Sequence, residues 1–405
     1  MTGVERSSRS GPDRLARQTA EIHRLAVIGA GLVGGSLCLA ARAAGVEHVW
    51  VTDRDPGVRT RVQQLGLADQ VHDTVQDAVA DAELVVVAVP AEAVAEVVVA
   101  VAEAAPAHAV VTDVASLKTA TTLEVESRLR DLERRHGDRE PGLALARYIG
   151  GHPMAGSERS GPEAADASLF QAATWVLTPT AASDDRALRT LSGFLRRIGA
   201  RVLVLPPQRH DELVAVVSHL PQLVASALAD LAAEQAETTG EALLAVAGGG
   251  FRDTTRIAAS DPDLWSGILR GNRAPVLDAL AAYRRRLDDL HEALATEDWE
   301  VVEELLRRAS SARRRLVPKA AGARLVDLVV ALEDRPGALA EATTALGEAG
   351  VNVEDLAMRH AEEGSRGALL VRIEAAASDR AVAALERGGL HVHVEDVDPG
   401  AGSHA

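Results

Sequence analysis

Two hydrophobic patterns alternate in the first half of the chain. Short continuous apolar runs are typical of strands buried on both faces, and the alanine-rich stretches between them have a helical period. The runs lie at Leu25–Ile28, His48–Thr52, Leu84–Val89, Ala109–Thr112, Arg147–Gly150 and Thr174–Leu177, and the helical stretches at 33–44, 56–65, 91–104 and 117–134. This alternation predicts an α/β fold with a Rossmann-like, doubly wound parallel sheet over residues 21–206, with Arg201–Leu205 as an added edge strand.

A second pattern begins after Pro206 and Pro207, where long stretches of helical period replace the strand-like runs. These stretches extend over residues 208–238, 240–247, 262–270, 272–295 and 297–315. We predict an all-helical (all-α) substrate and dimerisation domain over residues 207–316. Its helices carry more apolar surface than one copy can cover, so we expect a homodimer.

Strand-like runs return near the C-terminus. They lie at 325–332, 351–359, 367–374 and 390–395, and helical stretches lie at 337–349 and 378–387. Their order predicts a small βαββαβ, ferredoxin-like domain over residues 324–397. We expect residues 1–20 and 398–405 to be a disordered leader and tail, and residues 317–323 to be a linker.

The amino-acid composition argues against several classes of function. The chain has 43 basic and 59 acidic residues, a formal charge of −16, which argues against nucleic acid or an anionic membrane as main partner. Its single cysteine excludes a disulfide framework and a cysteine-based zinc site, and no cluster predicts a metal site. Residues 1–20 lack the apolar core of a signal peptide, and prolines and glutamates interrupt the apolar stretch 84–111. We therefore expect a cytoplasmic protein without a membrane span.

The most specific local motif follows the first strand-like run. Gly29, Gly31 and Gly34 have the spacing G-x-G-x-x-G, and a helical stretch begins near Leu32. The first glycine would permit a tight turn, the second would let a pyrophosphate approach the backbone, and the third would let the helix pack against its strand. The N–H groups at the start of the helix would bind the phosphates. The motif predicts binding of a dinucleotide.

Asp53 indicates which dinucleotide is bound. It follows the second strand-like run, about 20 residues after the glycines, where a carboxylate binds the ribose hydroxyls of NAD and would repel the 2′-phosphate of NADP. We expect NAD, although the adjacent Arg54 could offset the repulsion and leaves dual use of NADP open. The alternative role of Asp53 is that of a turn residue before Pro56. The candidate cofactor-binding residues are Gly29, Gly31, Leu32, Gly34, Asp53 and Arg54.

Two further segments place candidate catalytic side chains at the carboxyl edge of the predicted sheet. Ser116 follows a strand-like run, and its alternative role is that of a helix N-cap. His152 lies among Gly150, Gly151 and Pro153, which would fix a loop that presents the imidazole where open α/β sheets bind ligands. An imidazole with a pKa near neutrality suits removal of a proton from a hydroxyl.

Polar residues in the helical region give additional candidates. His219 lies on a long helical stretch, where most histidines have a structural role. Arg252 and Arg256 follow three consecutive glycines, and an arginine can bind a carboxylate through two parallel hydrogen bonds. Because only Lys118 and Lys319 among the 43 basic residues are lysines, an individual arginine can also be an ordinary surface charge.

Together these segments resemble the prephenate and arogenate dehydrogenases of tyrosine biosynthesis. The similarity covers about residues 22–300 and rests on GAGLVGGS, DVASLK, GGHPMAGSERSG, SHLPQ and GGGFRDTTRIAASDPDLW, in the family's order. It implies that His152 is the catalytic base, that Ser116 assists it, and that Arg256 binds the ring carboxylate of the substrate. It further implies a gating role for Glu158 in a polar network.

The same resemblance places Ser157 and His219 among the substrate-binding residues, and Asp253 and Trp265 also match its motif positions. The implied reaction is the NAD-dependent oxidative decarboxylation of prephenate. Hydride leaves the ring carbon for the nicotinamide, His152 takes the hydroxyl proton, and loss of carbon dioxide makes the ring aromatic. The protein then mainly positions the reactants and orients the base. Arogenate, which carries an amino group in place of the keto group, remains the alternative substrate.

The C-terminal segment resembles an ACT domain, a regulatory fold that commonly binds amino acids between copies. The similarity rests on LEDRPGAL at 332–339 and GVNV at 350–353. It implies L-tyrosine as a feedback effector, bound in part by N–H groups at a helix start near Gly337. The candidate regulatory residues are Asp334, Gly337, Ala338, Leu339 and Asn352. The alternative is a dimerisation module without a ligand.

Two other functions would share part of this sequence. A non-catalytic sensor of NAD and an amino acid would need the glycine motif and the ACT-like sequence, but not His152, Ser116 and Arg256 together. A hydroxyacid dehydrogenase would keep the glycine motif without GGHPMAGSE and GGGFRDTTR. An assay of NADH formation with prephenate distinguishes both of them from the prephenate dehydrogenase reaction.

Overall fold

The computed structural model describes residues 21–135, 142–156, 159–240, 242–316, 325–333, 335, 337–353, 355–360 and 366–396. The chain forms two compact units, up to Arg285 and from Arg286 onward, and their boundary lies within helix α13 (Arg273–Ala295). The expected leader 1–20, linker 317–323 and tail 398–405 lie outside the described residues.

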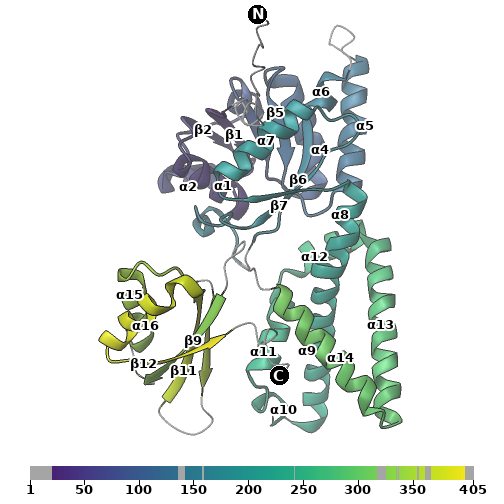
Figure 1. The fold of residues 1–405 in the computed structure, drawn as a ribbon. Coiled ribbons are helices and arrows are strands. Elements are labelled where there is room, and N and C mark those ends of the chain that lie inside the picture. The colour runs from purple at the N-terminus through teal and green to yellow at the C-terminus, as the bar shows by residue number, and fades with distance from the viewer. Residues whose placement is uncertain are drawn as a thin grey trace, which may run out of the picture. The chain divides into compact units, whose positions relative to one another are not determined.

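An eight-stranded sheet forms the frame of the first unit (Figure 1). Its strands are β1 (Arg24–Ile28), β2 (His48–Thr52), β3 (Gln70–Val71), β4 (Leu84–Val87), β5 (Val110–Asp113), β6 (Tyr148–Pro153), β7 (Thr174–Thr178) and β8 (Arg201–Val204). The spatial order is β3-β2-β1-β4-β5-β6-β7-β8, and all neighbours are parallel except β6 and β7. The strand order reverses between β1 and β4, which confirms the predicted Rossmann-like sheet.

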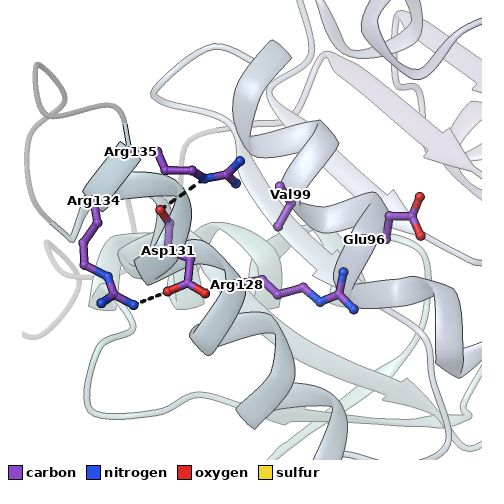
Figure 2. Close-up of a pocket in the computed structure, with 6 residues that line it drawn as sticks. All are labelled: Glu96, Val99, Arg128, Asp131, Arg134 and Arg135. Carbon is purple, nitrogen blue, oxygen red and sulfur yellow. Dashed lines mark hydrogen bonds and ion pairs between the residues drawn. The ribbon is translucent and has the colours of Figure 1, made fainter.

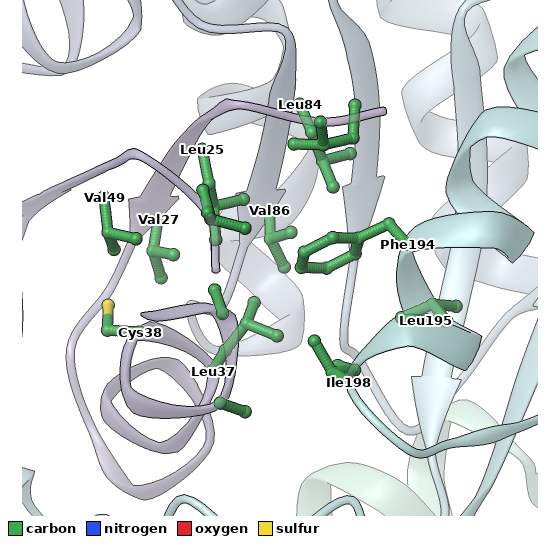
Figure 3. Close-up of a cluster of buried hydrophobic side chains, with 14 of the residues drawn as sticks. Leu25, Val27, Leu37, Cys38, Val49, Leu84, Val86, Phe194, Leu195 and Ile198 are labelled. Atoms are coloured by element: carbon green, nitrogen blue, oxygen red, sulfur yellow. The ribbon is translucent and has the colours of Figure 1, made fainter. Parts of the chain in front are cut away.

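Helices cover both faces of this sheet. They are α1 (Leu32–Ala43), α2 (Pro56–Leu65), α3 (Val75–Val79), α4 (Ala91–Ala104), α5 (Thr119–Arg135), α6 (Leu143–Ala146) and α7 (Asp185–Arg197). Successive side chains of β1 point to opposite faces, so Leu25 and Val27 pack with α1 and α7, whereas Ala26 and Ile28 pack with α3, α4 and α5. Figure 3 shows the first of these two cores, where side chains from β1, β4, α1 and α7 meet.

Helices make up the remainder of the first unit. They are α8 (Pro207–Val214), η3 (Ala215–His219), α9 (Leu220–Thr239), α10 (Ala242–Ala245), α11 (Gly249–Thr255), η4 (Arg256–Ala259), α12 (Pro262–Gly271) and the first part of α13. The continuous run from α8 to α9 matches the predicted stretch 208–238. Its middle, η3, is a π-helical turn that precedes Pro221, whose missing N–H cannot continue the α-helical ladder.

The run Pro207–Thr238 is long and apolar enough to cross a membrane by length and composition. It nevertheless carries His210, Asp211 and His219, which are buried in hydrogen bonds to other parts of the same unit. These contacts pack the first part of the run, up to His219, against the rest of the unit.

The second unit contains α14 (Trp299–Leu316) and a four-stranded sheet. The sheet consists of β9 (Leu325–Glu333), β10 (Asp355–His360), β11 (Arg366–Glu374) and β12 (His391–Asp396), in the antiparallel order β10-β11-β9-β12. Helices α15 (Ala338–Glu348) and α16 (Ser378–Arg387) contribute Leu346 and Leu385 to a core with Leu328 and Leu369 of the strands. This arrangement confirms the predicted βαββαβ domain.

Candidate active site

Each glycine of the turn between β1 and α1 has the geometry that its predicted role requires. Gly29 has a φ of +96°, and a Cβ atom there would collide with the carbonyl oxygen of Ala88. A Cβ atom on Gly34 would collide with the carbonyl oxygen of Gly29. Gly31, in contrast, has no neighbouring atom within 4 Å of that position, and it begins α1 without a side-chain cap. The turn therefore offers open space and unpaired N–H groups to a pyrophosphate.

Asp53 lies beside this turn, directly after β2. Its carboxylate accepts hydrogen bonds from the N–H groups of Ala30 and Asp55, both at 2.9 Å. A cavity of about 450 Å³ opens here, and it is lined by the glycine turn, Asp53 and Arg54, together with Asp55 and Asp73. The last two were not predicted. Three carboxylates in one cavity suit the uncharged ribose hydroxyls of NAD and oppose the 2′-phosphate of NADP.

A larger hollow of about 600 Å³ lies between α4 and α5 (Figure 2). Its lining residues are Glu96, Val99, Arg128, Asp131, Arg134 and Arg135. Ion pairs within α5 occupy two of its arginines, since Arg134 pairs with Asp131 and Arg128 with Glu124. It contains none of the candidate catalytic residues, and we do not assign it to the reaction.

His152 lies in strand β6, not on the loop expected from its glycine and proline neighbours. The end of β6 pairs antiparallel with β7, and His152 lies opposite Val176. The neighbouring glycine permits close packing, because a Cβ atom on Gly151 would lie 2.6 Å from the backbone oxygen of Asp113. The imidazole is therefore fixed by a strand at the carboxyl edge of the sheet.

The ring of His152 contacts a second histidine that the sequence analysis did not identify. Nδ1 of His152 lies 2.8 Å from Nε2 of His210 on α8, and Nδ1 of His210 lies 2.8 Å from Oδ1 of Asp211. His210 is 1% exposed and Asp211 is 4% exposed. The three side chains form a hydrogen-bonded series that begins in the protein interior and ends at His152.

Asp211 also caps the start of α5. It accepts hydrogen bonds from the N–H groups of Lys118 at 3.0 Å and Thr119 at 2.9 Å. The helix begins at Thr119, so Ser116 is not the N-cap that was its alternative role. Ser116 is half-buried, and within the described residues its hydroxyl makes no hydrogen bond. Its assistance to His152 stays a prediction.

Lys118 connects this region to the sheet. Its fully buried ammonium lies 2.5 Å from a carboxylate oxygen of Asp113 and donates a hydrogen bond to the carbonyl oxygen of Gly151 at 2.6 Å. Asp113 also accepts a hydrogen bond of 2.7 Å from the hydroxyl of Tyr148. A buried ion pair therefore holds the peptide that precedes His152.

The surroundings set the charge state of His152, the candidate base. Burial lowers the pKa of His152 well below 6.5, and the nearby His210, Lys118 and His219 lower it further against the opposing effect of Asp211. Burial alone would raise the pKa of Asp211, but hydrogen bonds from His210, Thr119 and Lys118 bring it below its usual value. At neutral pH the imidazole of His152 is therefore neutral and Asp211 is ionised.

His219 belongs to the same buried network. Nδ1 of His219 lies 3.1 Å from Nδ2 of Asn272, which also donates a hydrogen bond to the backbone oxygen of Asp211 at 2.8 Å. The ring of Trp265 meets His219 edge to face. Burial lowers the pKa of His219 to about 4, so its imidazole is neutral at pH 7. Its contact with substrate stays a prediction.

The predicted carboxylate-binding arginine lies farther along the helical region. Arg256 on η4 and Arg252 on α11 are both exposed, and neither side chain has a hydrogen bond or ion pair within the described part of the chain. Ser157 and Glu158 lie outside the described residues. Of the three consecutive glycines before Arg252, Gly248 is the N-cap of α11, and the next two lie in its first turn.

The candidate regulatory residues lie around the start of α15. Gly337 has a φ of +91° and begins the helix without a side-chain cap. Ala338 is buried, whereas Leu339 and Asn352 are exposed. Asp334 lies outside the described residues. The N–H groups at this helix start are those expected to bind a carboxylate.

Both halves of a redox site lie at the carboxyl edge of one sheet. The glycine turn and Asp53 follow β1 and β2, and His152 lies at the end of β6. Among the described residues, no group of three or more histidine, cysteine or acidic side chains is placed to hold a metal ion. A dinucleotide turn and a neutral imidazole suit hydride transfer coupled to loss of a proton. The fold and the site are those of a dinucleotide-dependent dehydrogenase.

Comparison with known proteins gives the family. The nucleotide-binding domain of prephenate dehydrogenase matches residues 37–204, the dimerization domain of prephenate dehydrogenase matches 206–308, and the ACT domain matches 326–387. Cyclohexadienyl dehydrogenase of Zymomonas mobilis is 31% identical over 290 residues, which cover 71% of this chain and 94% of that protein. Prephenate dehydrogenase of Bacillus subtilis is 30% identical over 351 residues, which cover 85% and 91%.

A solved structure agrees with these matches. The crystal structure of prephenate dehydrogenase from A. aeolicus, in complex with hydroxyphenyl propionate and NAD+, has a TM-score of 0.65 and 28% identity, and the match covers 74% of this chain and 100% of that one. The chain belongs to the prephenate dehydrogenase family. It is an NAD-dependent dehydrogenase with a C-terminal ACT domain, as the resemblance implied.

Proposed function

We propose that the chain catalyses the NAD-dependent oxidative decarboxylation of prephenate to 4-hydroxyphenylpyruvate, a step in tyrosine biosynthesis. The observation that carries this proposal is the position of the His152 ring, which contacts His210 at the carboxyl edge of the sheet that bears the dinucleotide turn. Support for the substrate comes from relatives named for prephenate and cyclohexadienyl compounds, and from the hydroxyphenyl ligand of the A. aeolicus enzyme.

Each candidate residue has a separate role in this reaction. His152 accepts the proton of the ring hydroxyl at Nε2, because its Nδ1 is occupied by His210. NAD bound at the glycine turn would take up the hydride from the same ring carbon. Arg256 binds the ring carboxylate, and Ser116 helps to orient the hydroxyl. Aromatisation after loss of carbon dioxide supplies the driving force, so the protein contributes mainly position and orientation.

The direct test is formation of NADH from prephenate and NAD, measured by absorbance, with detection of 4-hydroxyphenylpyruvate. Arogenate is the second candidate substrate, because one relative is named for cyclohexadienyl compounds in general. We therefore measure kcat/KM for both substrates with both NAD and NADP, and expect the highest value for prephenate with NAD. Absence of NADH formation with either substrate would contradict the proposed function.

Replacement of Arg256 by glutamine tests the carboxylate-binding role. Loss of a bidentate contact to a carboxylate typically costs a few kcal/mol, so we expect KM for prephenate to rise at least about tenfold, with the affinity for NAD unchanged. Arg252→Gln is the matched control, since Arg252 is also exposed and lies four residues earlier. If KM rises in that control and not in Arg256→Gln, Arg252 is the carboxylate ligand.

L-Tyrosine is the effector proposed for the ACT domain. We expect it to weaken substrate binding from a site near Gly337 and Asn352, and by linkage substrate must weaken tyrosine binding by the same factor. Truncation after Pro318 should remove this response and keep NADH formation, because the candidate catalytic residues all precede it. If the truncated and intact enzymes are inhibited equally and competitively, tyrosine binds the active site and the regulatory role fails.

A homodimer through the helical region is the proposed assembly, and the cytoplasm the proposed location. Leu231 on α9, Leu264 on α12, and Leu277 and Leu280 on α13 are exposed. Exposed leucines on three helices of one region favour an isologous contact with a second copy, and residues 206–308 match a dimerization domain. We expect the mass of a dimer in light scattering at micromolar concentration. A fully active monomer would contradict this assembly.

A further inference from the structure

The ring of His152 contacts His210, which in turn contacts Asp211. Both residues are buried, and neither lies in the motifs on which the family resemblance rests. We propose that His210, oriented by Asp211, is a positioning residue of the reaction: it holds His152 in the tautomer with Nδ1 protonated and Nε2 free to accept a proton. This inference deepens the proposed function and rests on His152 as the base.

The contact between Asp211 and His210 determines which nitrogen of His210 carries a proton. The carboxylate of Asp211 already accepts two backbone N–H groups at the start of α5, where the positive end of the helix dipole favours a negative charge. An ionised carboxylate can only accept hydrogen bonds. At 2.8 Å, Nδ1 of His210 must therefore carry the proton, since two facing lone pairs would repel each other.

His210 in turn determines which nitrogen of His152 carries a proton. A neutral imidazole protonated at Nδ1 has its lone pair at Nε2. Nε2 of His210 therefore accepts, and Nδ1 of His152, 2.8 Å away, must donate. The remaining nitrogen of His152, Nε2, then carries a lone pair. This is the protonation state that a general base needs.

A doubly protonated His210 would donate from both of its nitrogens. Nδ1 of His152 would then accept, and Nε2 of His152 would carry the proton. The two states of His210 therefore predict opposite tautomers of His152, and the tautomer of His152 decides between them.

Two substitutions separate the two contacts of His210. In His210→Asn, the side-chain amide can take the place of Nδ1 and keep the hydrogen bond to Asp211, but it leaves Nδ1 of His152 without its acceptor. In His210→Gln, the longer side chain can place its carbonyl oxygen near the former Nε2 atom and accept from His152. His108→Asn is the control, because His108 is exposed in the loop before β5.

We expect His210→Asn to lower kcat at least about tenfold, with NAD affinity and KM for prephenate nearly unchanged, because a wrong tautomer removes the base without removing binding contacts. His210→Gln should recover most of the lost kcat, and His108→Asn should match the unmodified enzyme. Circular dichroism confirms that the variants are folded. A wild-type kcat in His210→Asn, or a folded His210→Gln no better than His210→Asn, would overturn the proposal.

A measurement without substrate keeps this inference apart from the proposed function. Nitrogen-15 NMR of histidine-labelled full-length protein distinguishes the two tautomers, and we expect His152 to be protonated at Nδ1 in the unmodified chain and to lose that preference in His210→Asn. Protonation of His152 at Nε2 in the unmodified chain would refute the inference. If the enzyme forms no NADH with prephenate or arogenate while the expected tautomer is observed, only the proposed function fails.

Discussion

His152→Asn is expected to reduce turnover by a factor of about 10² to 10⁴ while leaving the affinity for NAD unchanged. Asparagine has no group that can accept the hydroxyl proton. Its amide can still donate a hydrogen bond to Nε2 of His210, so strand β6 and the buried pair behind it should keep their structure. The measurements are steady-state kinetics with prephenate and calorimetric titration with NAD. A turnover near that of the unmodified enzyme would remove His152 from the role of base.

The pH dependence of kcat/KM should report the same group. The pKa of His152 is lowered well below 6.5, and protonation removes the lone pair that accepts the substrate proton. The rate should therefore be constant from neutral pH down to 6.5 and fall only in more acidic solution. In His152→Asn this acid limb should disappear. An acid limb centred at or above pH 6.5 in the unmodified enzyme would contradict the lowered pKa.

Most of the α/β fold could be predicted because its signals are local. A buried strand such as His48–Thr52 is a continuous apolar run, and the structure places β2 at the same residues. Elements too short to build a pattern were missed: β3 has two residues and α3 has five. Helix α11 was missed for another reason, since its opening glycines have low helix propensity and indicate a loop.

The cofactor turn could be predicted for a similar reason. The roles of Gly29, Gly31 and Gly34 depend on contacts within one strand–turn–helix segment, and the structure shows the close approaches expected of the first and third. Asp73 was missed because the tertiary fold brings it to the cavity from the loop after β3, whereas Asp55 lies in the same loop as Asp53 and was overlooked. Residues within one motif are fixed by local geometry, whereas residues gathered by the tertiary fold are not.

The pair behind His152 illustrates the same limit. His152 and His210 are 58 positions apart, and their contact depends on how α8 packs against the end of β6. One signal was nevertheless present: Pro207, His210, Asp211 and Val214 are the buried residues of α8, at the spacing of one helix face. Polar side chains on the face that a helix buries need partners, and this pattern could have drawn attention to them.

Lys118 ends the DVASLK segment and is one of two lysines in an arginine-rich chain, and the structure gives its presence a physical meaning. Its ammonium is fully buried between the carboxylate of Asp113 and the carbonyl oxygen of Gly151. Lysine has a slender stem and a compact charge, whereas arginine has a planar fork that needs more space. Burial lowers the pKa of Lys118, against the opposing effect of Asp113.

Replacement of Lys118 by methionine is therefore expected to reduce the free energy of unfolding by about 3–5 kcal/mol, the usual cost when one partner of a buried ion pair is removed. Methionine fills a similar volume but leaves the carboxylate of Asp113 buried without its counter-charge. The measurement is urea unfolding, followed by circular dichroism and tryptophan fluorescence. Arg128→Met is the matched control on α5, where the exposed pair with Glu124 should contribute only about 0.3–0.5 kcal/mol.

A second substitution separates loss of the charge pair from loss of packing. In the double variant Asp113→Asn with Lys118→Met, no unpaired charge remains, and the asparagine can still accept a hydrogen bond from the Tyr148 hydroxyl. We expect this variant to be more stable than Lys118→Met alone, because a buried charge without a partner costs more than a neutral amide. If Lys118→Met loses no more stability than Arg128→Met, or if the double variant recovers nothing, the buried charge is not what makes Lys118 necessary.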